Sequence, residues 1–156
     1  MPSPAATRYT LAALLVLLPA GGAEASATLD CTISDAAVEA SANAILAHGI
    51  PAPLSNVSGE ITLKSAKGLP TLPPKTTFEG EHLAHSWVLG PDLKLQLYRE
   101  LDGDGVTALD LVIETRRAGS DDEAPYRGRY TLKASWVDKG EAKSKTFSGK
   151  VVCTAG

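Results

Sequence analysis

Several motifs that would point to a common enzyme class are missing from this 156-residue chain. There is no Gly-x-Ser-x-Gly elbow, which presents a nucleophilic serine in many hydrolases. A phosphate-binding glycine loop and a dinucleotide fingerprint are also absent, so the sequence predicts no cofactor. Serines and aspartates are plentiful enough for a spatial Ser-His-Asp set, but no spacing selects one. The sequence therefore leaves enzymatic activity open but favours a protein that is not an enzyme.

Long hydrophobic runs are scarce, and the one prominent example lies near the N-terminus. Residues 11–19 are apolar but too few to span a bilayer, and Arg8 precedes them. The sequence Ala-Glu-Ala at 23–25 then supplies the small-x-small pattern of a signal-peptidase site. We predict a signal peptide cleaved after Ala25, with cleavage after Ala27 as the alternative. A less favoured interpretation is an N-terminal anchor that stays attached.

Removal of residues 1–25 leaves residues 26–156 as a single domain. No later stretch approaches about 18 apolar residues, so we expect no membrane insertion after cleavage. These features predict a periplasmic or secreted protein. The alanine-rich, asparagine-poor composition and the compact signal indicate a bacterial source.

Only two cysteines are present, and they do not form a C-x-x-C pair. In an exported chain the simplest outcome is one disulfide between Cys31 and Cys153. It would close a loop of about 120 residues, for which the chain-entropy model gives roughly 4–5 kcal/mol. The alternative is a pair of free thiols with a redox or metal role.

Charge is distributed unevenly, although the formal net charge is only −3. Residues 79–123 contain eleven acids and four bases, whereas residues 126–156 contain seven bases and two acids. The favoured interpretation is that neighbouring strands carry opposite charges and pair across a sheet. The other is a basic patch for an anionic partner.

The pattern of apolar residues predicts one helix followed by about six strands. Alanine-rich residues 35–48, with Ser34 as N-cap and Gly49 as terminator, favour a helix. Alternating apolar and polar residues predict strands at 59–65, 76–90, 93–101, 106–115, 126–137 and 144–153. The short connections require antiparallel pairing. We expect a mainly β (α+β) fold, in which this helix precedes an antiparallel meander that forms a small barrel or sandwich.

The sequence Asp102-Gly103-Asp104-Gly105 has the look of a calcium loop. An EF-hand-type count starting at Glu100 places leucine where the closing bidentate carboxylate belongs, so calcium binding is disfavoured. A hairpin with a three-residue loop at 103–105 instead keeps the flanking leucines on one face. It places Leu97 opposite Leu111 and Leu95 opposite Ile113, and it puts a left-handed residue at Gly105.

Two of the three histidines, His82 and His85, lie three residues apart. On a helix they would share a face and could bind a metal, but on a strand they point to opposite sides. Surface histidines are therefore the favoured interpretation. His82, His85, Asp102 and Asp104 are the weak metal candidates.

The sequence best supports an exported, non-enzymatic binding or interaction domain. The candidate surface carries Arg127, Arg129 and Lys133, together with Tyr98, and its partner would be a periplasmic or extracellular protein or a small molecule. Nucleic acid is disfavoured by charge and export. The alternatives are a small metal-dependent hydrolase using His82 and His85, and a small-molecule carrier with a barrel cavity.

Overall fold

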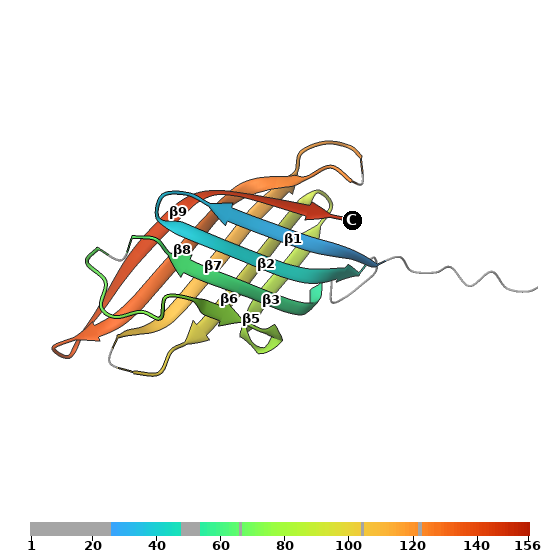
Figure 1. Cartoon of the computed structure of the whole chain (residues 1–156). Helices are drawn as coiled ribbons and strands as arrows, with labels where there is room; N and C mark the ends of the chain where they lie inside the picture. The colour runs from blue at the N-terminus through green and yellow to red at the C-terminus, as the bar shows by residue number, and fades with distance from the viewer. Residues whose placement is uncertain (1–25, 48–53, 66, 104, 122) are drawn as a thin grey trace, which may run out of the picture.

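The computed structural model describes residues 26–47, 54–65, 67–103, 105–121 and 123–156, which form one antiparallel sheet. Its nine strands lie in the order β4-β3-β2-β1-β9-β8-β7-β6-β5 (Figure 1). The strands are β1 (Ser26–Ser34), β2 (Val38–Ala47), β3 (Leu54–Leu63), β4 (Thr76–Phe78), β5 (Leu83–Leu89), β6 (Asp92–Glu100), β7 (Val106–Arg117), β8 (Tyr126–Asp138) and β9 (Glu141–Ala155). A short 3-10 turn, η1 (Gly80–His82), separates β4 from β5. The predicted mainly β class and antiparallel pairing are confirmed.

The sheet curls into a half-barrel, so that β1, β2 and β3 lie across the layer formed by β5 to β9 (Figure 1). The side chain of Leu97 on β6 lies close to Gly59 on β3, where an added Cβ would come within 3.4 Å of it. The Arg99 guanidinium also donates a hydrogen bond to the Thr77 hydroxyl at 3.0 Å, joining β6 to β4. The two ends of the sheet are therefore held face to face.

One hydrophobic core fills the space between the two layers. Its largest fully buried side chains are Tyr126, Tyr130, Phe78, Leu29, Ile33, Ile61, Leu93, Leu95, Leu97, Leu109, Leu111 and Ile113. They come from strands on both sides of the curl, so neither layer has a core of its own. In the described part of the chain, no helix is long and apolar enough to cross a membrane.

The predicted helix over residues 35–48 is wrong, because most of this segment is strand β2. Val38, Ala40, Ala42, Ala44 and Leu46 are buried at every second position, which is the period of a strand. Alanine has high helix propensity, but here the alanines of β2 are buried in the common core of the sheet. Tertiary packing therefore outweighs the local preference.

Three further strands account for the rise from six predicted strands to nine. One is β1, which contains Cys31 and was not predicted as a strand. The segment replacing the helix is the second. The third arises because the predicted strand over 76–90 is divided by η1, where the backbone N–H of Glu79 donates to His82 Nδ1 at 2.9 Å.

The hairpin between β6 and β7 has the predicted register. Leu97 pairs with Leu111 and Leu95 pairs with Ile113, so both strands direct their leucines into the core. The left-handed conformation described in the loop is at Gly103, with φ of 117°. Gly105 has a different role, because a Cβ there would lie 1.9 Å from the carbonyl oxygen of Thr71. The proline-rich connection thus packs directly on this turn.

The predicted disulfide joins Cys31 on β1 to Cys153 on β9. These residues are direct partners in the β1–β9 register, and both are buried. Next to them, Thr28 and Gly156 exchange two backbone hydrogen bonds of 2.8 and 3.1 Å. The bond therefore lies where the first and last strands close the sheet.

A second link between the layers forms at the β1–β2 turn. Asp35 accepts hydrogen bonds from the N–H groups of Ala37 and Val38, and its other oxygen accepts one from the Tyr130 hydroxyl of β8. The Tyr130 bond, followed by the backbone bonds, holds the pKa of Asp35 below its ordinary value of 3.8. Burial, and then the bond to Asp35, raises the pKa of Tyr130. Gly149 leaves room for this contact, because a Cβ there would lie 2.8 Å from the tyrosine ring.

Replacement of both cysteines in Cys31→Ala/Cys153→Ala should lower the free energy of unfolding by about 4–5 kcal/mol, because the cross-link closes a loop of 122 residues. Urea unfolding of the oxidised wild type and the double variant measures this difference. Wild type treated with a reductant provides the control and should approach the variant. Equal stability of all three samples would contradict the prediction.

The Asp35→Asn variant should be less stable than wild type at neutral pH. A lowered folded-state pKa gives a stabilising contribution that is present above 3.8 and is lost as pH falls through the folded value. The difference between variant and wild type should therefore shrink by about pH 3. Urea unfolding at both pH values tests this, with Tyr130→Phe as the matched variant that removes only the donor. A difference that does not change with pH would count against it.

Candidate functional site

The four residues of the predicted binding surface all lie on the outer face of the sheet, the side directed away from the core. Arg127, Arg129 and Lys133 alternate along β8 with buried side chains that include Tyr126 and Tyr130. Tyr98, on β6, is 41% exposed. The sheet register places Asp110 of β7 opposite both Tyr98 and Lys133, so these residues form one row across three strands. The two arginines lie in rows further along the strands.

Basic side chains from three strands meet around the two arginines. Arg127 lies opposite Arg116 of β7, and Arg129 lies opposite Lys150 of β9. We call these four residues the basic cluster. Like charges directly opposite each other destabilise a sheet, so this arrangement has an electrostatic cost. Gly128 allows the strands to approach, because a Cβ there would lie 1.9 Å from the Glu114 carbonyl oxygen.

Ion pairs on this outer face join β6 to β7. Lys94 Nζ lies 2.7 Å from Glu114 Oε1, and Arg116 lies 3.2 Å from Asp92. The hydrogen bond to Glu114 raises the pKa of Lys94. Among the described residues, no ion pair involves the other three members of the cluster. The favoured interpretation is confirmed in part: the register places Glu114 opposite Arg129 and Asp110 opposite Lys133, whereas Arg127 and Lys150 have basic neighbours.

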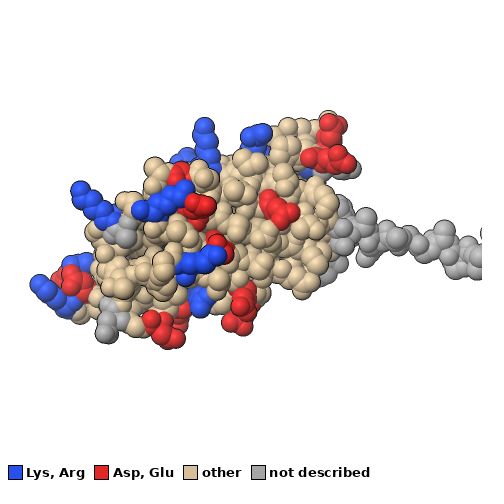
Figure 2. All heavy atoms as spheres, viewed as in Figure 1, with Lys and Arg blue, Asp and Glu red and all other residues tan. Residues whose placement is uncertain are grey.

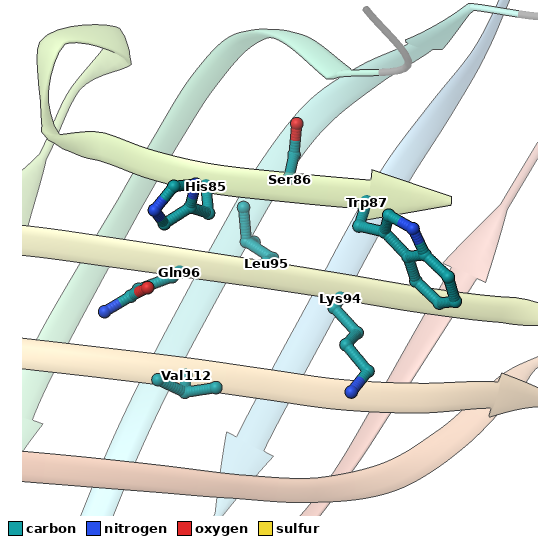
Figure 3. Close-up of a pocket in the computed structure, with 7 residues that line it drawn as sticks. All are labelled: His85, Ser86, Trp87, Lys94, Leu95, Gln96 and Val112. Carbon is teal, nitrogen blue, oxygen red and sulfur yellow. The ribbon is translucent and has the colours of Figure 1, made fainter. Parts of the chain in front are cut away.

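A groove lies beside the cluster on the same face, over β5, β6 and β7. It has a volume of about 320 Å³ and is lined by His85, Ser86, Trp87, Lys94, Leu95, Gln96 and Val112 (Figure 3). Trp87 is 43% exposed, and the Lys94 ammonium lies 5.9 Å from the centre of its ring. The Gln96 amide donates to Asp110 at 2.8 Å.

Sequence reasoning missed Trp87, Lys94, Gln96 and Val112 as site residues. Alternation over residues 83–89 could have placed His85 and Trp87 on one side of a strand, but the neighbours on β6 and β7 depend on register. Ser86 points away from His85, as successive residues of a strand do (Figure 3). The imidazole is therefore not placed to activate this hydroxyl.

The weak metal candidates do not come together. His82 lies in η1, edge-on to Phe78 with ring centres 6.0 Å apart, whereas His85 lines the groove. Asp102 is exposed at the β6–β7 turn, and Asp104 lies outside the described residues. Within the described ranges, no group of three or more His, Cys, Asp or Glu side chains is arranged to hold a metal ion.

The opposite face of the molecule has a different chemistry. The outward side chains of β2 include Ser41 and Asn43, and Glu39 there pairs with Lys64 at 3.0 Å. Figure 2 shows that uncharged residues cover most of this face and that acidic and basic groups are interspersed. A cluster of one sign is therefore a property of the β7–β9 side.

Comparison of the chain with protein-family models, curated proteins and solved structures found no match in any of the three.

Proposed function

We propose that this protein is an exported, non-enzymatic binding domain that holds an anionic partner on the outer face of β5 to β9. The basic cluster is the observation that carries this proposal. Arg127, Arg129 and Lys150 project from adjacent strands, and among the described residues no acidic side chain forms an ion pair with them. Asp92 and Glu114 lie on the acidic side of the cluster, so the excess of positive charge lies toward β8 and β9, where it can attract and orient an anionic partner.

Export is supported by the covalent structure. A disulfide that closes the sheet is typical of proteins in an oxidising compartment, such as the periplasm or the extracellular space. The predicted signal peptide itself, residues 1–25, lies outside the described residues.

The two alternative functions receive less support. A metal-dependent hydrolase would need His82 and His85 to converge, but one caps a turn while the other lines the groove. A carrier would need a cavity between the layers, and large side chains such as Tyr126, Tyr130 and Phe78 pack there. The outer face therefore remains the best-supported site.

The basic cluster should retain the protein on a sulfonated, synthetic-polymer cation exchanger at pH 7 and low salt, although its formal net charge is −3. The variant Arg127→Glu/Arg129→Glu should pass through unretained. The control Lys67→Glu/Lys139→Glu changes the net charge equally at two exposed sites outside the cluster, and it should still be retained. Equal elution of the two variants would contradict the proposal.

Expression of the full chain in a Gram-negative host should yield a periplasmic protein whose mass corresponds to residues 26–156 with no free thiol. Cleavage after Ala25 keeps Ala27, which pairs with Leu46 and packs against the core. Mass spectrometry of the periplasmic fraction, before and after reduction and alkylation, measures both features. Recovery of only the uncleaved, reduced chain would overturn the proposed export.

A further inference from the structure

We propose that the groove between His85 and Trp87 binds one sugar ring of a carboxylate-bearing glycan, and that the remaining acidic rings lie along the basic cluster. This inference rests on the proposed function, because it assigns a ligand class to the same anion-binding face. It adds a second recognition element, the groove, to the charge of the cluster.

The two walls of the groove are spaced for a single ring. His85 and Trp87 are two residues apart on β5 and are both exposed on the outer face (Figure 3). Alternate residues of a strand are separated by roughly 6.8 Å. The Trp87 indole points away from His85, so the space between the two side chains is wider than this backbone spacing and can admit one sugar ring (Figure 3). A pyranose ring offers apolar C–H faces to such walls.

The floor of the groove suits the rim of a sugar. Val112 supplies an apolar surface, while Gln96 and Lys94 supply polar groups (Figure 3). The Gln96 amide donates one hydrogen bond to Asp110 and still has an acceptor oxygen and a second N–H. Sugar hydroxyls both donate and accept hydrogen bonds, so they can pair with the acceptor oxygen and with the free N–H of this amide. The hydrogen bond to Asp110 also fixes the amide before the ligand arrives, which lowers the entropic cost of binding.

The charges beside the groove favour an acidic ligand. No carboxylate lines the groove, but Asp110 accepts from its Gln96 at 2.8 Å and Glu114 pairs with its Lys94 at 2.7 Å, so the positive charge for an acidic ligand comes from Arg129 and Lys150. The register forms a continuous row across the sheet, from Trp87 on β5 through Lys94 and Glu114 to Arg129 and Lys150 on β9. Strands are about 4.8 Å apart, so Arg129 lies roughly 14 Å from Trp87 along this row. A chain of several acidic sugars can therefore occupy both features at once.

The volume indicates one ring of a longer chain. About 320 Å³ is near the lower end of small-molecule sites, which hold roughly 300–1,000 Å³. Single-stranded nucleic acid also combines stacking with negative charge. The Cys31–Cys153 bond and the proposed export favour a ligand found outside the cytosol, which is the glycan.

The oxidised mature protein should be titrated calorimetrically with trigalacturonate, an oligomannuronate and a hyaluronan tetrasaccharide, with neutral galactotriose alongside. At least one acidic probe should bind more tightly than about 1 mM, and galactotriose should bind more weakly than that probe. Trp87→Ala should weaken binding about tenfold or more. The matched control is Leu89→Ala, which removes an exposed side chain of the same strand and face outside the groove and should bind as wild type. Thermal unfolding of both variants checks that they are folded.

Three results would overturn the groove assignment. They are no binding of any acidic probe, equal binding by wild type and Trp87→Ala, and Trp87-dependent binding of a thymidine decanucleotide with no glycan binding. In each case, retention on the synthetic cation exchanger still reports on the basic cluster. If no glycan binds in the groove but the protein is still retained on the cation exchanger, the proposed function stands and only the glycan proposal fails. If the protein is also not retained, both proposals fail.

Discussion

The pairing of β1 with β9 is the contact on which the rest of the structure depends. Every other strand pair in the described sheet joins neighbours in the chain, whereas this pair joins residues more than a hundred positions apart. Its register is short, with four residues of β1 paired to β9 against thirteen of β8. Closing such a long loop has a large entropic cost, and the Cys31–Cys153 bond offsets it by constraining the unfolded chain. The Asp35–Tyr130 contact supports the same closure from the nearby turn.

Closure also decides which side chains are available for binding. Once β1 to β4 fold across β5 to β9, the inward side chains of both layers are buried in one core. The outward residues of the larger layer are then arranged in rows by the antiparallel register. The basic cluster takes its four members from three strands, and the groove takes its lining from β5, β6 and β7. Neither feature exists on any one strand.

The sequence predicted much of the larger layer and little of the smaller one. In β6 and β7 the leucines alternate strictly. Only a turn with an odd number of residues keeps both sets of leucines on one face, so the pairing of Leu97 with Leu111 could be derived. In β2 the buried positions also alternate, but several of them are alanines. Because alanine has a high helix propensity, this segment was predicted as a helix. The outward position of Arg127 and Arg129 followed from alternation, but their proximity to Arg116 and Lys150 did not. Trp87 was missed because its neighbours in the groove, Lys94 on β6 and Val112 on β7, depend on the register of two strand pairs.

The sequence by itself determined the features that depend on nearest neighbours or on simple counting. These are the strand periodicity, the register of the β6–β7 hairpin and the pairing of the only two cysteines. The tertiary structure decided that the alanine-rich segment is a strand, that the sheet closes through β1 and β9, and that four cations share one surface. The physical reason is that the alternation of apolar and polar residues indicates only which face of a strand a side chain occupies. Which strand lies beside it is set by long-range hydrogen bonding and by the burial of a common core.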